Sequence, residues 1–425
     1  MRETGEGAPR PLRVALLSYR GNPHCGGQGV YVRHLSRELA ALGHAVTVFA
    51  GQPYPVLDPG VRLVKVPSLD LYREEDPFRI PRAREIASPV DLLEVATMCT
   101  GGFPEPRTFS LRVAPLLLAR RGELDVVHDN QSLGTGLLRV LAGGLPVVAS
   151  VHHPVTVDLA LELAEAPSRA RRRSLRRWYR FARMQARVAR ALPRLLTVSR
   201  SSARDVAAEM GVDPGRIAVV PVGVDDATFR PYPQVARVPG RIMTTASSDV
   251  ALKGLAYLLE ALAKLRTEHE QAHLVVIGRL REQSRAREVL GRFGLERAVT
   301  FVSGEADEQI ARRYATASCA VVPSLYEGFS LPAIEAMATG TPLVATTGGA
   351  LPEVVGEDGD AALLVPPADA SALAEAIGRL LGDARLARRL AERARRRVLD
   401  RFTWAATATR TAEEYRRVLE GGGRC

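Results

Sequence analysis

Two glutamates in the segment PSLYEGFSLPAIEAMATGTPLVATTGG, residues 323–349, have a spacing that could place both carboxylates in one ligand site. Glu327 lies in a loop after the apolar run CAVVP, and Glu335 comes eight positions later in a helical pattern. Because the two residues belong to different elements, both can face the same cleft. Carboxylates there suit ligand hydroxyls: one can bind the diol of a ribose and the other the hydroxyls of a sugar.

The residues between the two glutamates favour an anion site at the start of a helix. Gly328 allows the backbone to approach a ligand closely, and Pro332 suits the first turn of a helix, where its missing N–H costs nothing. The free amides of this helix start attract negative charge. We therefore predict that an anionic ligand binds at the amides near Phe329, Ser330 and Leu331.

A second glycine-rich loop, PHCGGQG at residues 23–29, follows the first strand-like run and opens a helix. Its glycines, Gly26 and Gly27 among them, let backbone amides approach a phosphate. The loop is incomplete as a dinucleotide fingerprint, because the third glycine of G-x-G-x-x-G is replaced by Val32. A plain turn is the alternative interpretation.

The E-x7-E spacing within EGFSLPAIEAMATGTPLVAT closely resembles the retaining glycosyltransferases of family 4. The resemblance extends over nearly the whole chain, through GGQGVYVRHLSREL, LTVSRSSARDV, VGVD, LKG and AALLVPPAD. It implies two Rossmann-like domains facing across a cleft (the GT-B type), a nucleotide-diphosphate sugar as donor and an acceptor hydroxyl. By the resemblance, Glu335 would hold the nucleotide ribose and Glu327 the transferred sugar. The loop of Gly26 and Gly27 would close over the donor phosphates and the acceptor.

Histidine and acidic side chains follow two strand-like runs of the first half. His152 ends the run PVVASV and resembles the family's active-site histidine, which contacts the donor sugar. Without the resemblance, a histidine at a strand end is more often structural. His128, Asp129 and Asn130 end another run and could line the acceptor side. We assign Asp129 and Asn130 to that side.

Lys253 precedes Gly254 after the segment TTASSDVAL. In the family this loop carries an arginine and, five or six residues later, a lysine, and both neutralise the pyrophosphate. The arginine positions are Ser247 and Ser248 here, so the chain departs from the family. We predict Arg279, after the run HLVVIG, as the substitute. The predicted catalytic residues are Glu327, His152 and Lys253.

Neither a metal nor a cofactor is predicted. Asp358-Gly359-Asp360 matches the D-x-D metal motif of another glycosyltransferase class, but its setting GEDGDAALLV indicates a turn before a strand. The four cysteines form no C-x-x-C pair, so they indicate neither zinc nor a disulfide framework and fit a reducing cytoplasm. Positive side chains and helix dipoles can balance a diphosphate instead. For the donor nucleotide, UDP is favoured over GDP.

The elements that would position these residues repeat one pattern in two halves. Strand-like runs alternate with amphipathic helical patterns, which predicts parallel sheets flanked by helices. The fold class is therefore α/β with two doubly wound domains, and ligands are expected at the carboxyl ends of the strands. Residues 67–109 form a long, poorly periodic insertion. The predicted organisation is an acceptor-side domain over 1–222, a linker over 223–240, a donor-side domain over 241–402, and a terminal helix over 403–425 that can pack back on the first domain.

The segment 169–194 contains 11 arginines and no acidic residue, and its pattern predicts one amphipathic helix. Its apolar face is expected to pack on the sheet. The exposed arginines, of which we single out Arg172, Arg176 and Arg180, remain able to meet lipid phosphates on an anionic membrane surface. A merely solvated basic face is the alternative.

Composition limits the remaining classes. The net charge is +11, from 58 basic and 47 acidic side chains, but the basic segment lacks interleaved exposed aromatics and no nucleic-acid-binding motif occurs. The polar start MRETGEGAPRPLR does not suit a secretory signal, so we expect a cytoplasmic protein that can lie on the cytoplasmic face of the membrane. The rival functions are a sugar-nucleotide epimerase, a phosphorylase, and a catalytically inactive membrane- or nucleic-acid-binding scaffold. A phosphorylase needs a pyridoxal lysine, and only Lys253 of the three lysines is expected near the cleft.

Overall fold

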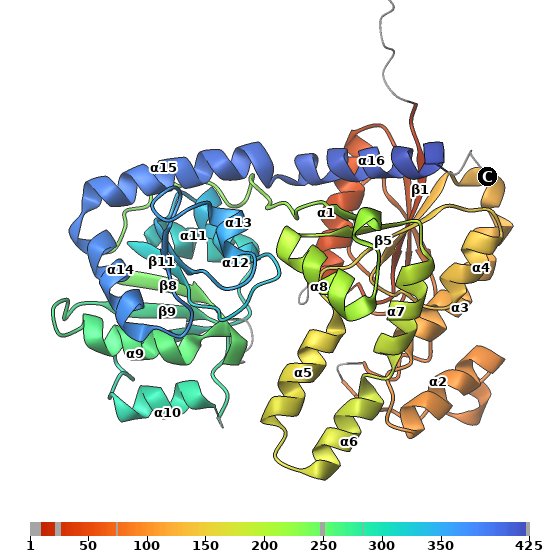
Figure 1. Ribbon diagram of the computed structural model, residues 1–425, viewed down its shortest axis with the longest axis horizontal. Helices are drawn as coiled ribbons and strands as arrows, with labels where there is room; N and C mark the ends of the chain where they lie inside the picture. The colour runs from red at the N-terminus through yellow and green to blue at the C-terminus, as the bar shows by residue number, and fades with distance from the viewer. Residues whose placement is uncertain (1–9, 22–26, 74, 247–250, 283, 422–425) are drawn as a thin grey trace, which may run out of the picture. The chain divides into compact units, whose positions relative to one another are not determined.

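The computed structural model describes residues 10–21, 27–73, 75–246, 251–282 and 284–421. The chain divides into two compact units, and each unit has its own parallel sheet flanked by helices (Figure 1). The predicted α/β class with two doubly wound sheets is thereby confirmed. Unit 1 comprises Met1–Val198, Ser202–Val220 and Thr407–Cys425, and unit 2 comprises Ser199–Ser201 and Pro221–Ala406.

The sheet of unit 1 has seven parallel strands in the order β3-β2-β1-β4-β5-β6-β7. β1 pairs with β2 on one side and β4 on the other, so the carboxyl ends of β1 and β4 flank the point where the strand order reverses. β4 and β5 are buried along their whole length, as expected for strands covered on both faces. The strands are β1 (Arg13–Ser18), β2 (Ala45–Ala50), β3 (Arg62–Lys65), β4 (Val126–Asn130), β5 (Val147–Ser150), β6 (Arg194–Thr197) and β7 (Ile217–Val219).

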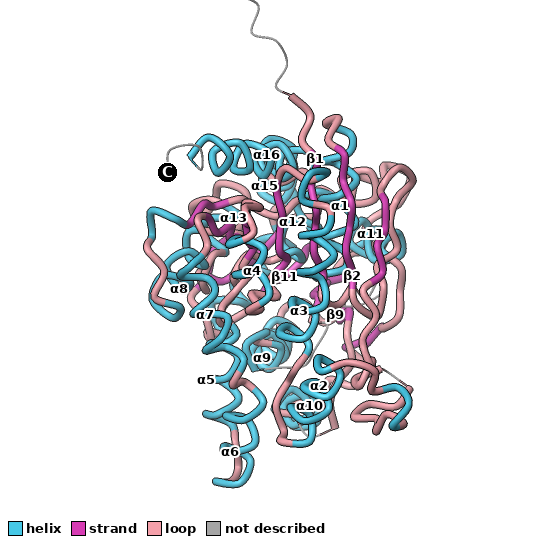
Figure 2. The backbone as a smooth tube through the Cα atoms, turned by 90° about the vertical axis from the view of Figure 1, so that its right-hand side faces the viewer, coloured by secondary structure: helices cyan, strands magenta, loops and turns pink. Residues whose placement is uncertain are grey.

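The helices of unit 1 lie on both sides of this sheet (Figures 1 and 2). α2 packs on α3, and α5 packs on α6. In both views α5 and α6 extend away from the strands. The first residues of α8 and α16 belong to unit 2, and the rest of both helices belongs to unit 1. The helices are α1 (Gly27–Ala41), α2 (Pro89–Cys99), α3 (Glu105–Ala119), α4 (Gly136–Ala142), α5 (Val155–Glu165), α6 (Arg169–Trp178), α7 (Phe181–Ala191), α8 (Arg200–Met210) and α16 (Trp404–Gly421).

The arginine-rich segment 169–194 forms two helices, which corrects the prediction of one. The break lies at Tyr179, whose hydroxyl donates to Glu162 Oε1 of α5 at 2.7 Å and whose ring stacks on Phe181. These tertiary contacts override the continuous helical pattern. The apolar face packs inside the unit as expected: Val188 and Leu192 belong to the core beside the sheet, and Trp178 packs on a smaller cluster around Tyr72.

The insertion over residues 67–109 is more regular than its sequence pattern indicates. It contains a 3-10 turn (Ala83–Glu85), the whole of α2 and the start of α3. Ser88 caps α2 by accepting from the Asp91 amide, and Pro89 follows at the first helical position. The capping residues were present in the sequence, but the short apolar pattern concealed the helix.

The sheet of unit 2 has six parallel strands in the order β10-β9-β8-β11-β12-β13. β8 pairs with β9 and β11, so the order reverses beside its carboxyl end. The strands are β8 (Arg241–Thr245), β9 (His273–Ile277), β10 (Val299–Val302), β11 (Cys319–Val322), β12 (Leu343–Thr346) and β13 (Leu363–Val365). The helices are α9 (Leu255–Leu265), α10 (Arg285–Arg292), α11 (Asp307–Thr316), α12 (Leu331–Ala338), α13 (Leu351–Val355), α14 (Ala370–Gly382) and α15 (Ala384–Arg401).

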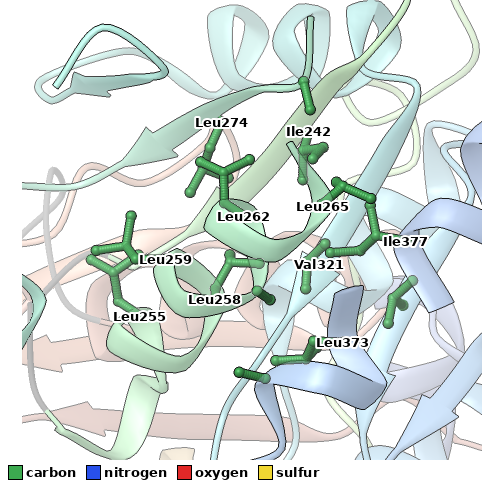
Figure 3. Packing of buried hydrophobic residues seen from close by; sticks show 14 of the residues in the cluster. Ile242, Leu255, Leu258, Leu259, Leu262, Leu265, Leu274, Val321, Leu373 and Ile377 are labelled. Carbon is green, nitrogen blue, oxygen red and sulfur yellow. The ribbon is translucent and has the colours of Figure 1, made fainter. Parts of the chain in front are cut away.

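The core of unit 2 forms between its sheet and helices α9 and α14. Figure 3 shows Leu255, Leu258 and Leu262 on α9 pointing into the cluster, together with Leu373 and Ile377 of α14. The three leucines of α9 are at most 3 % exposed, because their spacing of three and four residues places them on one helix face. This packing fixes the start of α9, which follows Lys253.

The final helix, α16, joins the core of unit 1 through two hydrogen bonds. The hydroxyl of Tyr415 lies 2.6 Å from His128 Nδ1, and Arg194 Nε donates to Glu414 Oε2 at 2.6 Å. Within the residues that the structure describes, no helix has the length and apolar character needed to cross a membrane.

Candidate active site

The loop between β11 and α12 carries Glu327 and ends at Ser330. Ser330 has a left-handed backbone, with φ 93°, and its hydroxyl accepts from the Ala333 amide at 3.4 Å. Pro332 falls in the first turn of α12, as predicted. Phe329 is buried and its ring packs edge-on against Phe402. The structure therefore has a helix N-terminus beside the Glu327 loop.

Lys253 and Glu327, predicted separately, form an ion pair in unit 2. Lys253 Nζ lies 2.8 Å from Glu327 Oε1, and the Ser324 hydroxyl donates to the same oxygen at 2.7 Å. Glu327 is 8 % exposed, so this carboxylate is nearly removed from water. A ligand that binds Lys253 must compete with this carboxylate or share the ammonium with it.

Gly254 explains why the lysine reaches the Glu327 loop. Its φ is +66°, and a Cβ at this position would lie 2.0 Å from the Pro323 carbonyl oxygen. Only glycine fits both the left-handed backbone and this close approach. The Leu325 amide also donates to the Leu252 carbonyl at 2.8 Å, which joins the two loops directly.

Glu335 lies on α12 and is partly buried. Among the described residues its carboxylate has no hydrogen-bond or ion-pair partner, although its main chain is bonded within the helix. Burial raises the pKa of Glu335 to about 8, and the nearby Asp307 carboxylate contributes in the same direction. With this raised pKa the carboxyl group is mostly protonated at neutral pH, so it can both donate and accept hydrogen bonds with a neutral, hydroxyl-bearing ligand.

Other predicted residues of unit 2 have hydrogen-bond partners outside the Lys253–Glu327 ion pair. Arg279 follows β9 at an exposed position, where its Nε donates to Ser303 at 3.3 Å. Asp358 accepts from the Leu364 amide at 2.8 Å in a turn before β13, as its sequence indicated. Ser247 and Ser248, the positions of the missing arginine, lie outside the described residues. No group of three metal-ligating side chains occurs in the described ranges.

In unit 1, the structure brings His152 and Asn130 together. His152 Nε2 lies 2.8 Å from Asn130 Oδ1, and the ring of Tyr31 packs edge-on against the imidazole at 4.7 Å between ring centroids. Burial lowers the pKa of His152 to about 4, with a smaller effect of His153. The imidazole is therefore neutral at physiological pH and can form hydrogen bonds without adding charge.

The start of α1, which follows the glycine-rich loop, contacts Asn130. Gly27 is the first residue of that helix, whereas Gly26 lies outside the described residues. Asn130 Nδ2 donates to the main-chain oxygen of Gln28 at 3.4 Å. The first turn of α1 therefore contacts the residue that binds His152.

Asp129 and His128 are core residues of unit 1 and do not line an open surface. Both are fully buried. The Asp129 carboxylate accepts from the Ser132 hydroxyl and, at 2.8 Å, from the Leu133 amide, so it stabilises its own loop. Burial raises the pKa of Asp129 to about 6, and these hydrogen bonds oppose the shift. Neither side chain is exposed in this structure, and the assignment of Asp129 to the acceptor side stays a prediction.

Sequence reasoning missed Gln131, which positions the His152 loop. Its Oε1 accepts from the His152 amide at 2.7 Å, and its Nε2 donates to the His153 carbonyl at 2.8 Å. Gln185 of α7 in turn donates to the main-chain oxygens of Gln131 and Ser132. Gln131 adopts a left-handed φ of 58°, which is uncommon for glutamine and gives no signal in the sequence.

Comparisons with known proteins agree with this architecture. Residues 25–228 match the family described as Glycosyltransferase Family 4, and residues 235–397 match Glycosyl transferases group 1. The solved structure of sucrose-phosphate synthase from Thermosynechococcus elongatus superimposes with a TM-score of 0.71 at 25 % identity, covering 96 % of this chain and 100 % of that one. The chain belongs to glycosyltransferase family 4, and it is a glycosyltransferase.

Two relatives are similar over nearly their whole length. The MMP alpha-(1->4)-mannosyltransferase of Mycolicibacterium hassiacum is 53 % identical over 97 % of this chain and 100 % of its own. D-inositol 3-phosphate glycosyltransferase 2 of Catenulispora acidiphila is 31 % identical over 96 % of both chains.

Proposed function

We propose that the protein is a retaining α-(1→4)-mannosyltransferase, which moves mannose from a nucleotide-diphosphate sugar to a hydroxyl of an acceptor. The 53 % identity to a mannosyltransferase over its full length supports the sugar and the linkage. The main structural support is the Lys253–Glu327 ion pair beside the N-terminus of α12.

This arrangement suits a diphosphate leaving group. Lys253 supplies one positive charge, and the amides at the start of α12 supply the positive end of a helix dipole. Glu335, without a partner among the described residues, offers its carboxyl group to the ribose diol. Glu327 offers its second oxygen to hydroxyls of the transferred sugar while Oε1 holds Lys253.

The configuration at the sugar C1 can be retained without a protein nucleophile. The bond from the sugar C1 to the diphosphate oxygen breaks, and the acceptor oxygen forms its bond to C1 from the same face. The acceptor proton passes to an oxygen of the departing diphosphate. Glu327 is a poor nucleophile, because its charge is shared with Lys253 and Ser324. Charge stabilisation of the leaving group and positioning supply the rate enhancement.

Unit 1 contributes His152 to the proposed reaction. A neutral imidazole held by Asn130 can donate or accept a hydrogen bond at a sugar hydroxyl without repelling the charge that develops at C1. Asn130 and Gln131 act as positioning residues for it.

We propose in addition that α6 contacts an anionic membrane surface, which would favour a lipid-linked or membrane-proximal acceptor. Arg172, Arg176 and Arg180 are exposed. Phe78 and Ile80 are 58 % and 86 % exposed, and the ring of Phe78 lies 6.0 Å from that of Trp178 at the end of α6. Exposed arginines together with exposed apolar side chains suit the interface between lipid tails and phosphates.

The direct test is a donor panel with UDP- and GDP-linked mannose and glucose, and a mannoside acceptor. Release of the nucleoside diphosphate gives the rate, and NMR of the product gives the linkage and the configuration at C1. Transfer of mannose to an α-(1→4) linkage is expected, and the UDP and GDP donors test the prediction that favours UDP. A β-linked product, or no transfer from either mannose donor, would refute the proposal.

A further inference from the structure

A groove of about 470 Å³ opens in unit 1 between the start of α3 and the helices α6 and α7. Its volume lies in the range of small-molecule sites, about 300–1,000 Å³. One part of the wall is apolar, formed by Phe103, Phe181 and Met184. Threonines and five arginines line the rest of the wall, and no carboxylate lines the groove. The arginines are Arg107, Arg177, Arg180, Arg183 and Arg187.

These guanidinium groups have no counter-charge. All five arginines are exposed, and within the described residues none of their side chains makes an ion pair or hydrogen bond. Arg112, one and a half turns along α3 from Arg107, instead binds both Asp91 and Glu94 of α2. An arginine of α3 thus forms ion pairs with α2, whereas the five arginines of the groove form none among the described residues.

Five like charges around one groove repel one another, because charges interact over a Debye length of roughly 10 Å at 0.1 M salt. A ligand of high negative charge relieves this repulsion and satisfies several guanidinium forks at once. Phosphate groups match the planar fork of arginine in two-point contacts. The apolar wall leaves room for an uncharged part of such a ligand.

We propose that this groove is a binding site for a phosphate-bearing ligand with more than one negative charge. All of its lining belongs to unit 1, whereas Lys253, Glu327 and Glu335 belong to unit 2. It contacts the His152 loop through α7: Arg183 and Arg187 face the groove, and Gln185 between them binds the main chain of Gln131.

The experiment measures binding of inorganic tripolyphosphate by calorimetry to the full-length protein and to R183Q/R187Q. Loss of contacts to a charged ligand is expected to weaken binding at least tenfold. The matched control is R169Q/R173Q, which removes the same charge from exposed positions of α6 that do not line the groove. This control should bind nearly as well as wild type.

Lys253→Ala separates the groove from the donor site. Tripolyphosphate binding that persists in Lys253→Ala but is lost in R183Q/R187Q supports the groove whatever the outcome of the donor panel. Vesicles containing phosphatidylglycerol identify the source of the phosphate. Vesicle binding that is also lost in R183Q/R187Q assigns a lipid headgroup; unchanged vesicle binding in R183Q/R187Q assigns a free phosphate ester.

Equal tripolyphosphate affinity of wild type and R183Q/R187Q would overturn the proposal, as would equal losses in R183Q/R187Q and R169Q/R173Q. Circular dichroism and thermal unfolding of each variant exclude misfolding as the cause of lost binding. If R183Q/R187Q unfolds, the single variant Arg107→Gln on α3 gives the same comparison, since this residue reaches the groove from the opposite wall.

Discussion

Replacing Lys253 by alanine tests the centre of the proposed mechanism. Lys253 Nζ lies 2.8 Å from a Glu327 carboxylate that is 8 % exposed. Removing one partner of a buried ion pair costs about 3–5 kcal/mol, but the Lys253 side chain is 28 % exposed. Solvent reduces the loss, so we expect Lys253→Ala to lower the free energy of unfolding by about 1–3 kcal/mol.

Lys253→Ala should also slow the transfer reaction. A lost contact to a charged group costs about 1.5–3 kcal/mol, or roughly 10- to 100-fold, and here the group is the departing diphosphate. Initial rates at saturating donor measure the loss. Lys253→Arg should rescue poorly, because a planar guanidinium does not reproduce the geometry of a compact ammonium. Lys264→Ala is the matched control: it removes a lysine of α9 that donates to Ser371 instead.

A second variant distinguishes lost charge stabilisation from damaged structure. In Lys253→Ala/Glu327→Gln the unpaired carboxylate is gone, so stability should recover, while transfer should stay below that of Glu327→Gln alone. If Lys253→Ala keeps more than about a tenth of wild-type activity, the lost stabilisation is below about 1.4 kcal/mol. The reasoning would then be wrong, and Arg279 would be the next residue to replace.

Three further outcomes are expected. Glu335→Ala should weaken nucleotide binding about 10- to 100-fold in calorimetry. Because the pKa of Glu335 in the folded protein is raised to about 8, wild type should lose stability relative to Glu335→Gln as the pH rises from about 5 through 8. A difference in melting temperature between the two proteins that does not change with pH would contradict this. Activity should survive EDTA and Asp360→Ala should be mild, so a loss that Mn²⁺ or Mg²⁺ restores would refute the metal-free site. Co-sedimentation with anionic vesicles should fall with salt and on replacing Arg172, Arg176 and Arg180 by glutamine, whereas equal binding to neutral vesicles would contradict membrane docking.

The sequence predicted most of the sheet framework, because strands buried on both faces have continuous apolar runs that are easy to locate. β13 was predicted from the turn residues before it, because its own three residues give only a short signal. The helix break at Tyr179 was missed because it depends on a hydrogen bond to Glu162, which pattern and propensity do not report.

The sequence likewise predicted individual site residues from local motifs but did not predict the contacts between them. Lys253 and Glu327 were each found from local motifs, but their ion pair depends on Gly254 packing against Pro323, 69 positions away. Asp129 had the residue type and strand-end position of a ligand group, yet the Ser132 hydroxyl and Leu133 amide of its own loop occupy its carboxylate. A side chain's partners within a loop are not visible until the backbone of that loop is known.

The contribution of α16 to unit 1 has a consequence for synthesis on the ribosome. Domains usually fold in the order in which they emerge, but the first unit here lacks the segment that begins at Thr407 until the second unit has been synthesised. The hydrogen bonds of His128 to Tyr415 and of Arg194 to Glu414 cannot form until the second unit has been synthesised. A buried polar group without its partner costs about 1–3 kcal/mol, so the nascent first unit is incomplete and weakened. A premature stop codon before Thr407 would therefore damage the part of the protein that was made first.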